Sequence, residues 1–190
     1  MNSNALQLMD LTSLCAVLQD LRNKLIPSRF EKSQQYDKST IQLSLRTLKQ
    51  IHWIEISWQA DAPRIVQIPP PLRKEGESTL AKQFQHTLSR MALIEIKQEG
   101  YERIVELGFA IRPGQKIQRT ILIEIMGRHS NCFLLDENRK VITIGRQIRN
   151  HQSRVRPIST GDEYFPPPTL KGYKPNIDES FEEWKNRLCN

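Results

Sequence analysis

The sequence has 190 residues, of which 38% are hydrophobic and 26% are charged, with a formal net charge of +7. This composition is typical of a globular protein and excludes a disordered chain, and no apolar run approaches the roughly 20 residues of a membrane-spanning helix. The first residues lack the basic and apolar stretches of a secretory signal, so we expect a cytoplasmic protein without a membrane partner.

Hydrophobic periodicity predicts two helices. Leucines recur at helical spacing over residues 10–25, with Asp10 at the N-cap position and Pro27 after the last turn. The same period over residues 79–91, after Ser78 as a cap, predicts the second helix.

Alternating apolar and polar residues predict strands in the rest of the chain. We expect eight of them, at residues 40–47, 50–59, 64–69, 93–98, 101–111, 118–126, 132–136 and 140–145. Short turn signals between these segments favour antiparallel neighbours, so the predicted class is α+β, dominated by antiparallel sheet.

Proline and glycine cluster near the C-terminal end, which is typical of a linker. We therefore expect one domain over residues 1–165 and a Pro/Gly-rich linker over residues 166–176. Residues 177–190 predict the start of a helical domain that is truncated at the end of the sequence, because its apolar face has no further chain to pack against.

Basic residues concentrate in residues 139–156, a window that holds six Lys or Arg residues and no acidic residue. A solvated face is the ordinary interpretation of such a run. However, the guanidinium group suits phosphate, and five of the six basic residues are arginines. We therefore predict contacts to a nucleic-acid backbone from Arg146, Arg149, Arg154 and Arg156.

The polar string "GRHSN", residues 127–131, stands between two predicted strands and does not form a catalytic motif. His129 and Ser130 are adjacent, so in extended structure their side chains point to opposite faces. His129, Cys132 and Cys15 do not have the spacing of a usual zinc site. We expect no enzyme activity, no metal, no cofactor and no small-molecule substrate.

Four stretches resemble the N-terminal domain of the NFACT family, which includes bacterial RqcH, eukaryotic NEMF and proteins labelled fibronectin-binding protein A. The most specific stretch is "EIMGRHSNCFLLD", followed by "RPISTGDEYFPPP" at the expected distance. The others are "MDLTSLCAVLQDLRNKL" and "QEGYERIVELGF". The resemblance covers residues from about 8 to 168 and implies a β-sandwich with flanking helices, similar to the N-terminal domain of formamidopyrimidine-DNA glycosylases.

The resemblance also implies a function. RqcH-like proteins engage stalled large ribosomal subunits that carry peptidyl-tRNA, and they recruit alanyl-tRNA for template-free alanine tailing. The family residues implicated in engaging tRNA fall on Asp10, Glu102 and Arg103, with Glu102 in place of an aspartate. For Glu102 and Arg103, the alternative is simple pairing across a strand.

Arg128 and His129 are predicted as further tRNA contacts at the edge of the sheet. The alternative for Arg128 is an ion pair with Glu124 inside the fold. Two other functions also stay open: an extracellular-matrix adhesin, and a non-catalytic DNA-binding relative of DNA glycosylases. The glycosylase nucleophile is an N-terminal proline, whereas residue 2 is Asn2.

Overall fold

The computed structural model describes residues 8–73, 78–148, 156–168, 176 and 178–189. Arg149 and Arg154 lie outside these residues, as does most of the predicted linker. The described helices are α1 (Leu11–Leu25), α2 (Thr79–Leu88) and α3 (Phe181–Cys189), with one short 3-10 turn, η1 (Gly127–His129). The described strands are β1 (Ser28–Asp37), β2 (Thr40–Arg46), β3 (Ile51–Ser57), β4 (Arg64–Ile68), β5 (Ala92–Lys97), β6 (Ile104–Ala110), β7 (Arg119–Glu124), β8 (Asn131–Leu135) and β9 (Val141–Ile144).

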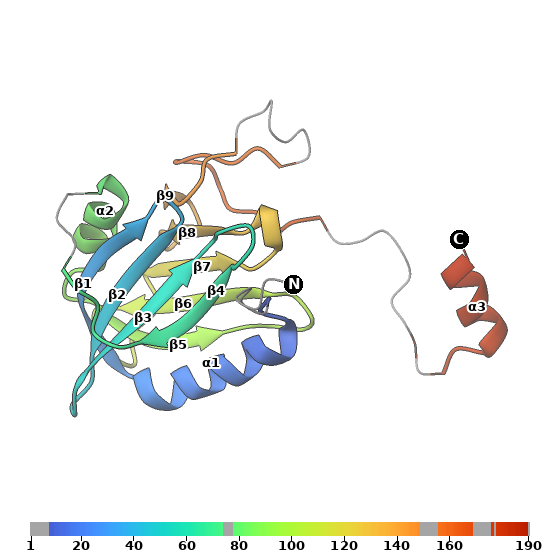
Figure 1. Cartoon of the computed structure of the whole chain (residues 1–190), viewed down its shortest axis with the longest axis horizontal. Helices are drawn as coiled ribbons and strands as arrows, with labels where there is room; N and C mark the ends of the chain where they lie inside the picture. The colour runs from blue at the N-terminus through green and yellow to red at the C-terminus, as the bar shows by residue number, and fades with distance from the viewer. Residues whose placement is uncertain (1–7, 74–77, 149–155, 169–175, 177, 190) are drawn as a thin grey trace, which may run out of the picture.

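The nine strands form one antiparallel sheet in the order β4-β3-β2-β1-β5-β6-β7-β8-β9. The joint between β1 and β5 is short, with only Ser28 opposite Leu93 and Arg29 opposite Ala92. The sheet therefore turns at this joint, and the strands β1–β4 cross in front of β5–β8 (Figure 1). The predicted α+β class and antiparallel arrangement are confirmed, with the two layers supplied by two halves of one sheet. The likeness to glycosylases stays a prediction.

The hydrophobic core lies between the two halves of the sheet. Alternate residues such as Ile54 of β3 and Ile123 of β7 point inward and are at most 1% exposed. The helix α1 adds its buried leucines and packs against β4 and β5, while α2 packs against β1 and β9. Each of these helices thus bridges one half of the sheet to the other.

Two expectations are wrong in detail. The strand β1 was missing from the predicted strands, because it is mostly polar and two irregularities of register interrupt its alternation. The helix α2 ends at Leu88 rather than near residue 91. Arg90 takes a left-handed backbone conformation (φ 67°), and the N–H of Met91 binds the carbonyl of Leu88.

Residues 156–168, which we call the segment after β9, run along the edge of this strand at residues 161–164. The N–H of Val141 binds the carbonyl of Asp162 at 2.9 Å, and the N–H of Tyr164 binds the carbonyl of Arg139 at 2.9 Å. Tyr164 and Ile158 are buried in a second hydrophobic cluster with residues of β7, β8 and β9. This segment is therefore part of the folded domain.

The predicted C-terminal helix is present as α3. Ser180 precedes it, and its hydroxyl donates to the carboxylate of Glu183 at 2.7 Å, while the N–H of Glu183 binds the Ser180 hydroxyl. Phe181 and Trp184 stack on its surface with ring centres 5.9 Å apart. None of the described helices is both long and apolar enough to cross a membrane.

Candidate functional site

Asp10 and Arg103 lie together at the N-terminus of α1. The Oδ1 atom of Asp10 accepts the N–H of Ser13 at 2.7 Å, as expected for an N-cap. Arg103 directly precedes β6, and its Nη1 donates to the carbonyl of Met9 at 3.2 Å across 94 positions of sequence. Hydrogen bonds from Ser13 lower the pKa of Asp10, and the charge of Arg103 lowers this pKa further. Two of the predicted tRNA contacts are thus brought into one site.

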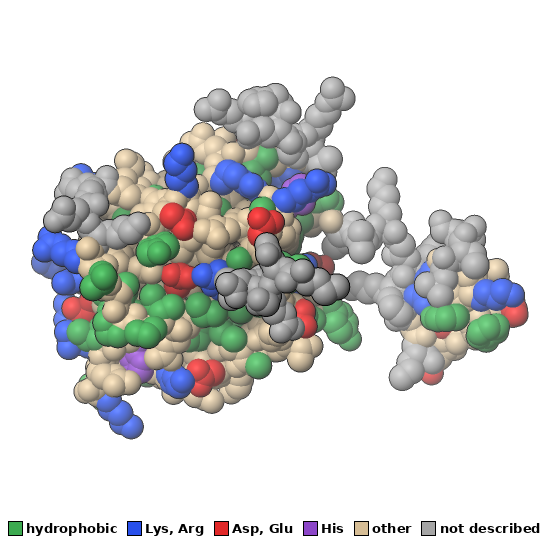
Figure 2. Space-filling view, viewed as in Figure 1, with side chains coloured by type: hydrophobic (Ala, Val, Ile, Leu, Met, Phe, Trp, Pro, Cys, Tyr) green, Lys and Arg blue, Asp and Glu red, His purple; other side chains and the backbone are tan. Residues whose placement is uncertain are grey.

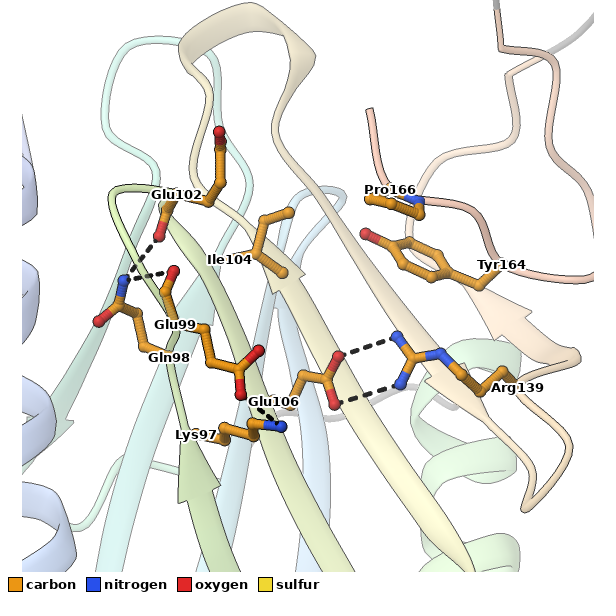
Figure 3. Close-up of a pocket in the computed structure, with 9 residues that line it drawn as sticks. All are labelled: Lys97, Gln98, Glu99, Glu102, Ile104, Glu106, Arg139, Tyr164 and Pro166. Carbon is orange, nitrogen blue, oxygen red and sulfur yellow. Dashed lines mark hydrogen bonds and ion pairs between the residues drawn. The ribbon is translucent and has the colours of Figure 1, made fainter. Parts of the chain in front are cut away.

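Glu102 lies beside Arg103 in sequence but faces a different pocket. This pocket has a volume of about 240 Å³ and lies between the β5–β6 hairpin and the segment at Tyr164 (Figure 3). The side chain of Gln98 fixes the loop below Glu102, because its Nε2 donates to the Glu102 carbonyl at 2.9 Å. Ile104 and Pro166 supply apolar walls.

The rim of this Glu102 pocket carries two ion pairs (Figure 3). Lys97 contacts Glu99 at 2.7 Å, and Arg139 holds Glu106 through two hydrogen bonds of 2.8 and 3.2 Å. Glu102 has no such cation partner among the described residues. Glu102 therefore forms no ion pair across a strand in the described part of the chain. For Arg103 the structural alternative stays open, because its carbonyl accepts the N–H of Ile125 across β6 and β7 at 2.9 Å.

The string "GRHSN" forms the turn between β7 and β8. Gly127 has φ +55°, a left-handed conformation that glycine adopts without steric cost. The hydroxyl of Ser130 accepts the N–H of Met126 at 2.7 Å, and Oδ1 of Asn131 accepts the N–H of Arg146 at 2.9 Å. Ser130 and Asn131 therefore satisfy backbone groups in the turn and beside it.

Arg128 and His129 project from this turn and are exposed. The Nε of Arg128 donates to Nε2 of His129 at 3.1 Å. Arg146 braces the turn from the end of β9, because its Nη2 donates to the carbonyls of Arg128 and Ser130 at 2.8 and 3.4 Å. Basic side chains and a histidine gather along the upper edge of the face in Figure 2.

The ion-pair partner of Glu124 is Arg156, so the alternative role of Arg128 is wrong. Nη2 of Arg156 lies 2.7 Å from Oε1 of Glu124, and the Tyr164 hydroxyl donates to the same oxygen at 2.8 Å. The Arg156 guanidinium also lies over the Tyr164 ring at 5.0 Å. Burial raises the pKa of Tyr164, and the charge of Glu124 raises it further. Arg156 is 15% exposed and is held inside the fold, which disfavours its predicted contact with a nucleic-acid backbone.

A second pocket opens beside the turn, and we call it the turn pocket. Its volume is about 530 Å³. Its wall includes basic residues from the turn and from the end of β9, the buried Glu124–Arg156 pair and several apolar side chains. The lining residues are Glu124, Met126, Arg128, His129, Arg146, Gln147, Ile148, Arg156, Pro167 and Pro168.

A family match over nearly the whole sequence identifies the family. Residues 10–190 match the family described as NFACT N-terminal and middle domains, so the chain belongs to the NFACT family. Two curated relatives are both called "Rqc2 homolog RqcH". The one from Streptococcus pneumoniae serotype 2 (strain D39 / NCTC 7466) is 28% identical over 163 residues, and the one from Streptococcus suis (strain 05ZYH33) is 28% identical over 170 residues. These alignments cover 84% and 86% of this chain but only 30% and 31% of the relatives.

Solved structures share the fold. The N-terminal domain of fibronectin-binding protein PavA from Streptococcus pneumoniae has a TM-score of 0.75 at 26% identity, covering 93% of this chain and 70% of that one. The N-terminal part of the fibronectin/fibrinogen-binding protein from Streptococcus suis has a TM-score of 0.76 at 26% identity, covering 92% and 67%. The fibrinogen binding protein from Staphylococcus aureus has a TM-score of 0.69 at 28% identity, covering 84% and 57%.

Sequence reasoning missed the buried cluster of Glu124, Arg156 and Tyr164. One signal was available, because Glu124 interrupts the apolar run "ILIEI" and a buried carboxylate needs a cation or hydrogen-bond donors. The choice of Arg156 over Arg128 depends on the path of the chain after β9, which local sequence does not determine.

Proposed function

We propose that this chain is the tRNA-binding module of a cytoplasmic ribosome quality control factor. In this proposal, the complete factor engages large ribosomal subunits that carry peptidyl-tRNA, and it recruits alanyl-tRNA for template-free alanine tailing. The chain itself binds RNA and catalyses no reaction. The observation that supports this proposal is the meeting of Asp10 and Arg103, the positions onto which the family's tRNA-engaging residues fall.

The chemistry of these residues suits RNA. The carboxylates of Asp10 and Glu102 accept hydrogen bonds from base amino or imino groups and from the ribose hydroxyl. Arg103 uses Nη1 for the carbonyl of Met9, and its Nη2 has no hydrogen-bond partner among the described residues. This free edge of the guanidinium is suited to a base edge or a phosphate. Arg128 and His129 extend the contact along the same end of the sheet.

The test is a titration of the 190-residue chain with alanine tRNA and with a non-cognate tRNA. Replacing Arg103 with Ala should reduce the ratio of the two affinities by about 5- to 150-fold, which corresponds to ~1–3 kcal/mol for a bidentate base contact. Arg112→Ala is the matched control, because this exposed arginine lies in the β6–β7 turn at the opposite end of β6.

Melting temperatures of both variants must be compared, because Arg103 also holds the segment before α1. An affinity ratio that stays at the wild-type value in a folded Arg103→Ala protein would contradict recognition by this residue. Duplex DNA serves as a competitor in the same titration, and preferential binding of DNA would support the glycosylase-like alternative.

An adhesin is the second candidate, because similar solved structures are named as fibronectin- or fibrinogen-binding proteins. Immobilised fibronectin and alanine tRNA can be compared with the same protein preparation. Saturable binding of fibronectin that exceeds the affinity for tRNA, and that survives Arg103→Ala, would favour the adhesin. Binding to tRNA alone supports the ribosomal function.

A further inference from the structure

We propose that the turn pocket binds one nucleotide of an unpaired RNA strand, with the phosphate on Arg128 and the base against the apolar wall. This inference rests on the RNA-binding function proposed above. It adds an RNA contact separate from Asp10 and Arg103. It assigns phosphate binding to one arginine of the pocket, and it gives the other two arginines the role of holding the pocket walls in place.

The charge of the pocket is positive at its mouth and neutral at its back. Glu124 is 1% exposed, and its charge is balanced by Arg156 at 2.7 Å. Neither Arg128 nor Arg146 has an acidic partner among the described residues. Since both side chains belong to exposed residues, the pocket presents two uncompensated positive charges to solvent. An anionic ligand is favoured there.

The guanidinium of Arg128 has the atoms needed for a phosphate. Its Nε is used by His129 at 3.1 Å, and this bond limits the rotation of the group. Its two terminal nitrogens have no hydrogen-bond partner in the described part of the chain. Two parallel N–H groups of this kind match two phosphate oxygens. Arg128 is therefore the phosphate-binding residue of the pocket.

Arg146 and Arg156 have positioning roles instead. The Nη2 of Arg146 donates to the carbonyl of Arg128 at 2.8 Å, which fixes the turn that carries the Arg128 side chain. Arg156 anchors the segment that leads to Pro167 and Pro168 through its contact with Glu124. One arginine thus fixes the cationic side of the pocket, and the other fixes the apolar side.

The opposite wall suits a nucleobase. Met126, Ile148, Pro167 and Pro168 present apolar surface around a volume of about 530 Å³. Small-ligand sites commonly have volumes of about 300–1,000 Å³ and combine apolar walls with a few polar groups. A base packs on such a wall while its phosphate reaches the cation. A phosphoserine peptide carries a phosphate but no base, so it is the comparison ligand in the test below.

The position of the pocket favours a strand that also reaches Arg103. The carbonyl of Arg103 accepts the N–H of Ile125 at 2.9 Å, and Met126 of the pocket follows directly. Both sites therefore lie at the same end of β6 and β7. Unpaired nucleotides in a tRNA loop provide the splayed bases that protein pockets bind.

The test uses 5′-phosphorylated pentauridylate, titrated against the 190-residue chain at several salt concentrations. Arg128→Gln should weaken binding by about 5-fold or more and reduce the slope of log affinity against log salt by ~0.7, the value for one phosphate contact in single strands. Met126→Ser should weaken binding without changing this slope. Arg112→Gln, at the far end of β6, should change neither quantity.

Three outcomes would overturn the proposal: no binding of pentauridylate by the wild-type chain, a folded Arg128→Gln protein with the wild-type affinity and slope, or tighter binding of uridine 5′-monophosphate or a phosphoserine pentapeptide than of pentauridylate. The two proposals also fail separately. Binding of tRNA that depends on Arg103, without binding of pentauridylate, would contradict only the proposal that the turn pocket binds a nucleotide. Pentauridylate binding that depends on Arg128, without discrimination between tRNAs, would contradict only the proposed tRNA recognition by Arg103.

Discussion

The guanidinium of Arg156 lies 2.7 Å from the carboxylate of Glu124, a side chain that is 1% exposed. This pair ties the segment after β9 to the last residue of β7. Tyr164 on the same segment donates its hydroxyl to the same carboxylate at 2.8 Å. The folded protein is strongly destabilised when a buried carboxylate loses its cation. The segment therefore has to lie where Arg156 reaches Glu124.

Replacing Arg156 with Ala should therefore lower the free energy of unfolding by roughly 3 kcal/mol, even though Tyr164 still donates to Glu124. Urea denaturation measures this loss. The triple variant Glu124→Leu, Arg156→Met and Tyr164→Phe should recover most of it, because apolar side chains of similar size can replace a buried pair and no buried hydroxyl is left without an acceptor. Equal stability of the wild type and Arg156→Ala would show that the ion pair does not hold the segment.

The contribution of the α1 N-cap, Asp10, to the stability of the folded protein should depend on pH. Hydrogen bonds from Ser13 and the charge of Arg103 hold the pKa of Asp10 below its ordinary value of 3.8. A pKa lowered by folding adds stability above the unfolded value, and this stability is lost as the pH falls through the folded value. The melting temperature of Asp10→Ala should thus lie below that of the wild type at pH 7, with a gap that narrows below about pH 4.

Ser78 provides the matched control for this cap. Its hydroxyl accepts the N–H of Ala81 at the start of α2, and it does not titrate in this range. The gap between wild type and Ser78→Ala should therefore be similar at pH 7 and pH 4. If both gaps change in parallel, the pH effect belongs to the whole protein and not to Asp10.

Gly145 lies against the indole ring of Trp58. A Cβ atom at residue 145 would fall 2.7 Å from two ring carbons, and Trp58 is 3% exposed, so the ring has little room to move. Gly145→Ala should destabilise the protein by about 1–3 kcal/mol, as overpacking does in other cores. In a Trp58→Leu background the same change should cost less. An equal cost in both backgrounds, measured by thermal unfolding, would exclude the clash as its cause.

The cysteines should differ in reactivity towards a thiol reagent. Cys15 is exposed on α1, whereas Cys132 is 1% exposed on β8 and burial raises its pKa. In a Cys189→Ser protein, dithionitrobenzoate should modify Cys15 in the native state, and Cys132 only after denaturation. Mass spectrometry of peptides identifies the labelled residue. Labelling of native Cys132 at the rate of Cys15 would contradict a closed core at β8.

Local signals predicted the helices best. The leucine spacing of α1 and the caps Asp10 and Ser78 act within a few residues, so sequence alone was sufficient for them. The end of α2 was not predictable in this way, because Arg90 takes a conformation for which glycine is the usual signal. The strand β1 was missed because its polar residues are partly covered by α2 and β2, and tertiary contacts of this kind leave no regular period.

The site was predictable in part. The resemblance placed Asp10 and Arg103 in one functional group, and the structure brings them to one end of α1. The roles of the arginines in the basic window were not separable from sequence. Arg146 binds carbonyl groups and Arg156 binds a carboxylate, and this difference arises from strand register and from the path after β9. Arg149 and Arg154 lie outside the described residues, so their role stays a prediction.

The segment after β9 also covers the outer edge of the sheet. The strand β9 is the last in the sheet, and hydrogen bonds between Val141 and the backbone of Gly161 and Asp162 occupy its outer edge. An open edge offers unpaired N–H and C=O groups to strands of other molecules. A shortened protein that ends before Ile158 would expose this edge, and it should oligomerise through β9 and precipitate at concentrations where the longer chain stays in solution.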